Sequence, residues 1–198
     1  MILDLPELIA RLKRHQVPAT VMGKTARRAA VAIVLTEQAG EPHMLMIRRA
    51  KRPGDPWSGH MGFPGGRRDE TDPCDLACAV RETQEELGLD LSAHTPICQL
   101  GLVNTGWRPD RPEILVQPYV FHLDDPPPFS PNAEVDGTVW IPVSFLANDD
   151  NREIHLWEWK GTSVESDSYR WGQDRVWGLS LMMIDEMIET IRRPLLNA

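Results

Sequence analysis

The chain has 198 residues, and its 21 basic and 29 acidic side chains give a formal net charge of −8. This length suits one domain with an ample core, and 41% apolar with 25% charged residues excludes a disordered chain. The acidic balance argues against nucleic acid as a partner. No apolar run approaches the roughly 20 residues that span a bilayer, so we expect no membrane partner.

Cysteine usage bears on the compartment. Cys74, Cys78 and Cys98 cannot all pair, and their spacing does not match a zinc motif. The first residues also lack the basic segment and apolar stretch of a secretory signal. We therefore expect buried, reduced thiols and a cytoplasmic location.

The first half of the chain predicts a helix followed by a hairpin. Apolar residues recur at helical spacing over 3–15, within an N-terminal extension at 1–27. The apolar run 29–35 predicts a buried strand, and a turn at Gly40 leads to its hairpin partner at 43–48.

A loop rich in Lys, Arg, Pro and Gly follows at 50–60, and a sharp break follows at 63–66. Asp72 with Pro73 predicts the start of a helix, with the aspartate as its cap. This helix is expected to run to about Leu87 and to end at Gly88.

The second half predicts strands and a closing helix. Segments 97–104 and 114–122 read as strands, and 139–141 reads as a short strand before a short helix. The tryptophan-rich segment 153–172 predicts a hairpin, and helical spacing returns from 179 to about 191.

The predicted helix after Asp72 carries an acidic cluster. At about 100° per residue, Glu82, Glu85 and Glu86 fall within roughly a 100° arc of one helical face. A solvated acidic face is the ordinary interpretation. However, the helix also carries apolar residues that pack it against a body, and it follows the Gly65-Gly66 turn. Carboxylates and exposed carbonyls are the oxygen ligands that Mg²⁺ or Mn²⁺ prefers.

The same stretch resembles the Nudix hydrolase box, G-x5-E-x7-R-E-U-x-E-E-x-G-U, where U is aliphatic. The matching positions are Arg81, Glu82, Glu85, Glu86, Gly88 and Leu89. Fourteen residues separate Gly66 from Arg81, where the box has thirteen, so its early acid falls near Asp72 or Glu70. Thr83 occupies a position that is usually aliphatic.

The resemblance extends beyond the box to the coenzyme A pyrophosphatase branch of the family. It includes Arg48-Arg49-Ala50, the segment 59–66 and the segment 176–180. It implies an α/β/α sandwich with a mixed β-sheet. It also implies a single domain over 1–198 that closes with a C-terminal helix at 177–193.

By this resemblance, Glu82, Glu85, Glu86 and the Gly65 carbonyl would hold Mg²⁺ or Mn²⁺. Arg81 would orient the glutamates through ion pairs, although an ordinary ion pair with Glu85 within the helix is the alternative. Metal ions would orient the attacking water and neutralise charge on the phosphoryl oxygens.

The catalytic base has two candidates. Glu134 lies in a loop six residues before Trp140, where several family members carry a glutamate; the alternative is an exposed loop acid. Glu85 is the competing base.

Basic side chains gather around the expected entry to the site, and arginine binds phosphate in a bidentate manner. The candidates for substrate binding are Arg48, Arg49, Arg52, Arg67 and His60, with Arg68 beside them. Surface charge is the alternative for any one arginine, and a structural hydrogen bond is the alternative for the histidine. Trp57, Trp107 or Trp177 would stack on an adenine base or pack in the core.

The resemblance implies hydrolysis of a nucleoside diphosphate linked to another group. The leading substrate is coenzyme A or an acyl-coenzyme A, which would yield adenosine 3′,5′-bisphosphate and a 4′-phosphopantetheine product. The alternatives are ADP-ribose, a dinucleotide or a nucleoside triphosphate as substrate, a non-catalytic nucleotide sensor, and an acidic interaction module. The expected partner is a small-molecule pyrophosphate, and a homodimer is left open.

Overall fold

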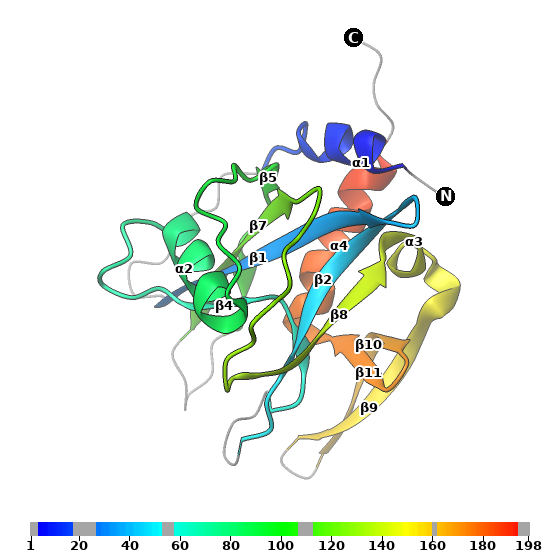
Figure 1. The fold of residues 1–198 in the computed structure, drawn as a ribbon. Coiled ribbons are helices and arrows are strands. Elements are labelled where there is room, and N and C mark those ends of the chain that lie inside the picture. The colour runs from blue at the N-terminus through cyan, green and yellow to red at the C-terminus, as the bar shows by residue number, and fades with distance from the viewer. Residues whose placement is uncertain (1–3, 18–26, 53–57, 107–112, 160–161, 194–198) are drawn as a thin grey trace.

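The structure is a computed structural model that describes residues 4–17, 27–52, 58–106, 113–159 and 162–193. It contains a large mixed sheet with helices on both faces and a smaller three-stranded sheet at one side (Figure 1). The expected α/β/α sandwich with a mixed sheet is therefore confirmed.

The large sheet has eight strands. They are β1 (Arg27–Gln38), β2 (Glu41–Arg49), β3 (Met61–Gly62), β4 (Gly65–Arg67), β5 (Cys98–Gln99), β6 (Val103–Asn104), β7 (Ile114–His122) and β8 (Val135–Pro142). Strand β1 pairs in parallel with β7, whereas its pairs with β2 and β4 are antiparallel. Strand β8 pairs with the far side of β2.

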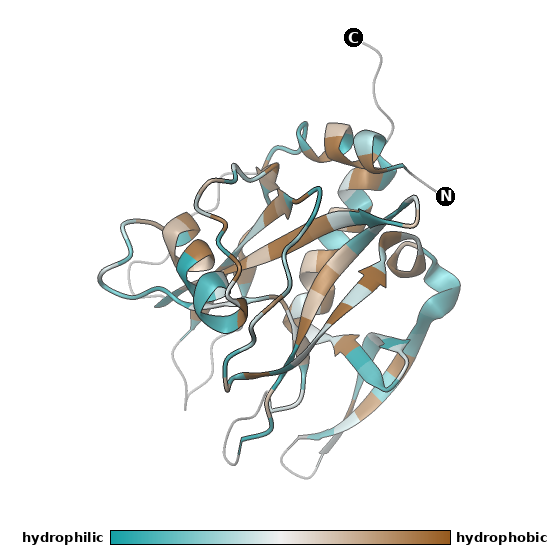
Figure 2. Ribbon diagram, viewed as in Figure 1, coloured by the Kyte–Doolittle hydropathy of each residue, from teal (hydrophilic) through white to brown (hydrophobic). Residues whose placement is uncertain are grey.

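Alternation along β1 and β2 produces the layers. Ile33 and Met44 belong to the core on one face, and Val34 and Leu45 belong to the core on the other. Successive side chains of a strand point to opposite faces, so strands that are apolar throughout must be covered on both sides. Hydrophobic residues are accordingly concentrated along β1 and β2 (Figure 2).

Helix α2 (Asp75–Leu87) covers one face of the sheet. It ends as predicted, because Gly88 adopts φ 69° and donates its backbone N–H to the Gln84 carbonyl. The predicted start is wrong. The cap position is Cys74, and the Asp72 carboxylate binds Arg81 instead of capping the helix.

Helices α1 (Leu5–Leu12) and α4 (Gly178–Arg192) pack against each other on the opposite face. Asp4 caps α1 by accepting the N–H of Glu7, and Arg11 reaches across to the Ile191 carbonyl at 2.6 Å. Leu8 and Leu12 are fully buried. The N-terminal helix predicted within 3–15 is therefore present, and its apolar side chains join the core on this face of the sheet.

The remaining predicted elements are largely confirmed. Segment 97–104 is the exception, since it divides into the two-residue strands β5 and β6. Strand β8 is longer than the predicted 139–141, and the short helix α3 (Val143–Leu146) and the 3₁₀ helix η1 (Asp149–Asn151) follow it.

The tryptophan-rich segment forms the expected hairpin, which is extended into a three-stranded sheet. Its strands are β9 (Arg152–Trp159), β10 (Thr162–Trp171) and β11 (Asp174–Trp177), in the order β11-β10-β9. The expectation of buried thiols fails at Cys74, which is exposed, whereas Cys78 is buried. No helix in the described part of the chain is long and apolar enough to cross a membrane.

Candidate active site

Arg81 is the centre of an ion-pair network on α2. Its Nε and Nη2 atoms donate to the two carboxylate oxygens of Asp72 at 2.9 and 2.8 Å. The same guanidinium lies 3.0 Å from Glu82 Oε1 and 3.2 Å from Glu85 Oε1. The intrahelical pair with Glu85 therefore exists, but it is one of three ion pairs that Arg81 makes with described residues.

Asp72 resolves which early acid pairs with the arginine. The sequence left Asp72 and Glu70 as equal candidates, and the structure buries the first and exposes the second. The Arg81 guanidinium holds the pKa of Asp72 at about 2, well below 3.8. Arg81 is in turn kept charged, because its hydrogen bonds to Asp72 raise its pKa.

Glu82 lies directly against the backbone of β4. A Cβ atom built on Gly66 would lie 2.5 Å from the Glu82 carboxyl carbon and from its Oε2. Glycine at this position is what allows the carboxylate to approach the strand. Burial is the largest cause of a raised pKa at Glu82, and Arg81 opposes it.

Glu86 is the most buried of the three glutamates, with 3% of its surface exposed. Its Oε2 accepts the Gly65 N–H at 2.8 Å, which fixes the carboxylate beside the glycine turn. Burial raises the pKa of Glu86 to about 7; the Gly65 hydrogen bond and Arg49 oppose the rise, and Glu82 and Glu134 add to it.

The carboxylate oxygens of Glu82 and Glu86 are the kind of ligand that a hard divalent cation binds. Burial raises the pKa of both Glu82 and Glu86, and the charge of Glu82 adds to the rise at Glu86, so a cation between the two carboxylates would stabilise their charged forms. Glu85 is exposed, at the outer end of the arc. Among the described residues, however, no group of three or more His, Cys, Asp or Glu is already placed around one metal position. To hold a metal ion together, Glu82 and Glu85 would exchange their contacts with Arg81 for contacts with the cation.

Glu134 approaches the same region from the loop before β8. It is exposed, and its Oε1 lies 3.1 Å from Arg52 Nη1. Its backbone carbonyl accepts the N–H of Ala50 at 2.8 Å, which ties this loop to the end of β2. The same loop is held beside the end of α2, because the Asn132 N–H donates to the Glu86 carbonyl at 3.0 Å.

Arg48 makes a different contact from the one predicted. Its Nε and Nη2 atoms donate to the two carboxylate oxygens of Asp174, each at 2.7 Å, and Asp136 lies 3.6 Å from Nη1. This guanidinium fastens β11 to β2. Its role in phosphate binding stays a prediction, and Asp174 is a partner that no local pattern in the sequence indicated.

His60 and Arg67 flank the glycine turn. The His60 carbonyl accepts the Arg49 N–H at 3.0 Å, and its ring lies 4.9 Å from that of Trp177. Arg67 is exposed, and its carbonyl accepts from Arg81 at 3.3 Å. Trp57 and Trp107 lie outside the described residues.

The unusual Thr83 of the box is accommodated within the helix. It is fully buried, and its hydroxyl donates to the Ala79 carbonyl at 2.7 Å. A polar side chain replaces an aliphatic one here because its hydroxyl is satisfied.

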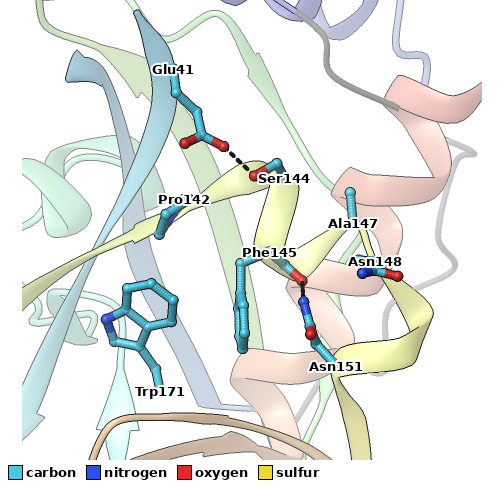
Figure 3. A pocket seen from close by; sticks show the side chains of 8 residues that line it. All are labelled: Glu41, Pro142, Ser144, Phe145, Ala147, Asn148, Asn151 and Trp171. Atoms are coloured by element: carbon cyan, nitrogen blue, oxygen red, sulfur yellow. Dashed lines mark hydrogen bonds between the residues drawn. The ribbon is translucent and has the colours of Figure 1, made fainter. Parts of the chain in front are cut away.

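The structure also contains a cavity of about 590 Å³, and Figure 3 shows the side chains that line it. It is lined by Glu41 at the start of β2, by Trp171 at the end of β10, and by residues of the segment 142–151 around α3. Glu41 and Arg49 are eight residues apart along β2, or about 26 Å. Neither Arg49 nor the acidic residues of α2 line this cavity.

Comparison with known proteins gives consistent findings. The family model described as "NUDIX domain" matches residues 26–159, which is 134 of the 198 residues. The chain is 31% identical over 154 residues to an uncharacterized protein of Schizosaccharomyces pombe, covering 65% of this chain and 45% of the relative. It is 26% identical over 195 residues to "Mitochondrial coenzyme A diphosphatase NUDT8" of Homo sapiens, covering 94% and 81%.

Among solved structures, a MutT/nudix family protein from Enterococcus faecalis aligns with a TM-score of 0.53 at 18% identity. The alignment covers 95% of this chain and 68% of that one, and it supports the fold alone. The chain spans about half the length of the first curated relatives that it matches, 45% in one case and 60% in another.

Proposed function

The chain belongs to the Nudix hydrolase family, and on that premise we propose that it hydrolyses the pyrophosphate bond of coenzyme A or an acyl-coenzyme A. The products would be adenosine 3′,5′-bisphosphate and a 4′-phosphopantetheine derivative. The observation that carries the proposal is the Arg81 network, which joins Asp72, Glu82 and Glu85 beside the buried Glu86.

The choice of coenzyme A is supported by the human relative's name, since the match to it spans most of both chains. The upstream segment 59–66 and the closing segment 176–180 resemble the same branch. Both segments lie near each other in the fold, because the His60 and Trp177 rings are in contact.

Glu82, Glu86 and the Gly65 carbonyl would hold Mg²⁺ or Mn²⁺, with Glu85 joining from the exposed end of the arc. A bound divalent ion supplies neutralising charge to the phosphoryl oxygens and lowers the pKa of water. Arg81 positions the two glutamates that it contacts, and the Gly65 N–H positions Glu86.

We assign the general base to Glu134, with Glu85 as the competitor. Each carboxylate contacts an arginine, Glu85 with Arg81 and Glu134 with Arg52, but Glu134 lies outside α2, in the loop before β8. Glu134→Gln should lower kcat by about 100-fold at saturating Mg²⁺, within the range for loss of a general base. An unchanged kcat would transfer the role to Glu85.

Arg49 and Arg52 lie at this end of β2 and are the best placed of the predicted phosphate ligands. Arg52 already lies beside Glu134, and Arg49 acts on Glu86 through its charge. The proposal includes a small-molecule substrate, no nucleic acid or membrane partner, and a cytoplasmic location.

A substrate panel tests the proposal. Coenzyme A, acetyl-coenzyme A, ADP-ribose, a diadenosine polyphosphate and nucleoside triphosphates are incubated with Mg²⁺ or Mn²⁺ in ¹⁸O-labelled water, and the products are weighed by mass spectrometry. The label shows which phosphorus is attacked. Fast turnover of another member without turnover of coenzyme A would refute the substrate.

A variant of a proposed metal ligand and a matched control test the role of the acidic cluster in turnover. Glu86→Gln should abolish turnover, while Glu70→Gln is the matched control because Glu70 is exposed and lies outside the Arg81 pairs. If the wild-type chain binds nucleotides but hydrolyses no pyrophosphate of the panel, the chain would instead be a nucleotide sensor.

A further inference from the structure

Two large apolar side chains are exposed next to each other on β9. Ile154 is 60% exposed and Leu156 is 61% exposed. In the described part of the chain, Met182 on α4 is the one other large hydrophobic side chain in this class, at 52%. Alternation places Ile154 and Leu156 on the same face of their strand. Adjacent exposed apolar residues on a strand mark an association surface more strongly than scattered ones.

The strand that carries them is a sheet edge. In the order β11-β10-β9, the eight-residue β9 pairs with β10 along its whole described length on one side. None of the described strands pairs with its other side, so the backbone N–H and C=O groups there lie at the edge of the sheet. An extended apolar edge of this kind is a template for another strand.

The sequence of β9 is complementary to itself in one register. Directly opposite residues of an antiparallel pair lie on the same face of the sheet. For the face of Ile154 and Leu156 to continue into the second copy, the two-fold axis must therefore lie where one residue is opposite the same residue of the second copy. An axis at His155 places Ile154 opposite Leu156 of the second copy. It also places Arg152 opposite Glu158, which joins opposite charges at both ends of the apolar pair.

A two-fold axis at either neighbouring residue of the same face gives a less complementary pairing. An axis at Ile154 or Leu156 matches one apolar residue with itself and sets the other opposite a charged side chain. Arg152 is already held in place, since it pairs with Asp185 and its guanidinium lies 5.3 Å from the centre of the Tyr169 ring. One of the two charges is thus preorganised before a partner arrives.

We propose that two copies of this chain form a two-fold symmetric dimer by antiparallel pairing of their β9 strands about His155. The two three-stranded sheets then make one continuous sheet of six strands. Ile154 and Leu156 of each copy cover those of the other, and the contact is isologous, as expected of a closed dimer. Strand β9 contributes no residue to the acidic cluster of α2, so the proposed dimer does not depend on the proposed hydrolysis.

The oligomeric state tests the surface. Sedimentation velocity on the full chain should show a dimer at about 100 µM that dissociates on dilution, as expected for an interface of modest area. Leu156→Glu should raise the dissociation constant at least 100-fold. Met182→Glu is the matched control and should leave it unchanged. Circular dichroism melting checks that both variants fold. A monomeric wild-type chain, or a dimer that Leu156→Glu leaves intact, overturns the proposal.

Crosslinking tests the register. In a Cys74→Ser background, which removes the exposed native thiol, His155→Cys places two thiols opposite each other across the axis. Opposed residues of an antiparallel pair have Cα atoms about 4.5–5.5 Å apart, within reach of a disulfide. Mild oxidation should give a covalent dimer, whereas Glu158→Cys, which faces Arg152, should not. Crosslinking at 158 with none at 155 overturns the register.

Discussion

The Glu82 carboxylate occupies the space that a side chain at position 66 would need. A Cβ atom on Gly66 would lie 2.5 Å from the carboxyl carbon and Oε2 of Glu82, and 2.7 Å from its Oε1. Gly66 has no left-handed backbone angle, and its pairing with Ala30 leaves it in ordinary strand geometry. Gly66→Ala therefore perturbs the carboxylate rather than the backbone.

The size of the effect follows from these distances. Ordinary contact begins near 3.4 Å, so the carboxylate must move by 3.4 − 2.5, or about 0.9 Å. That shift breaks its 3.0 Å contact with Arg81 and moves a proposed metal ligand. A displacement of about 1 Å in a catalytic arrangement costs roughly 100-fold in rate. Since the end of the Glu82 side chain can rotate, we expect less than about 1 kcal/mol of lost stability.

The assay measures kcat on the best pyrophosphate substrate over a Mg²⁺ titration, with thermal unfolding in parallel. Gly66→Ala should lower kcat and raise the Mg²⁺ concentration at half activity, with little change in Tm. Gly62→Ala is the matched control, because its Cβ would meet its nearest neighbour at an ordinary 3.9 Å. Wild-type kinetics in Gly66→Ala would refute the assigned position of Glu82, and equal losses in both variants would refute the steric reasoning.

Four further outcomes are expected. Gly65→Ala should fail to fold stably, because its Cβ would lie 2.3 Å from the Ala30 carbonyl oxygen and its φ is +147°; a cooperative melt near the wild-type Tm would contradict this. Asp72→Asn should cost about 2–4 kcal/mol in urea unfolding, because it leaves Arg81 without its bidentate partner. The pKa of Asp72 is lowered from 3.8 to about 2, so its contribution should be present above pH 4 and lost as pH falls from about 4 to 2; acid titrations of wild type and Asp72→Asn should converge over that range. The pKa of Glu86 is raised from 4.5 to about 7, so the metal-free fold should lose stability as pH rises from 4.5 to 7. Protons should also weaken Mg²⁺ binding about tenfold per pH unit below 7, and calorimetry showing pH-independent affinity would oppose its role as a ligand.

Much of the fold could be predicted because its signals are local. The strand at 114–122 and the hairpin about Gly40 follow from apolar runs and turn residues, and the structure has both. The end of α2 follows from Gly88, whose left-handed angle costs glycine little. The predicted beginning of α2 at Asp72 is wrong for a physical reason. Asp72 is a good cap residue, but its carboxylate gains more from two charged hydrogen bonds to Arg81.

In the candidate site, too, the features that could be predicted are the local ones. The arc of Glu82, Glu85 and Glu86 is a consequence of helical spacing, and the family resemblance rests on it and on Arg81. The roles of these residues, and the extent of the domain over 1–198, stay predictions.

The sequence by itself determined the acidic face, the glycine turn before it and the layers that sandwich the sheet, because helical and strand periodicities act over a few residues. Only the tertiary structure decided that Arg81 takes Asp72 rather than Glu70, and that Arg48 is joined to Asp174 across 126 residues. Such pairs depend on which distant segments the packed sheets bring within hydrogen-bonding distance, and no local pattern encodes that distance.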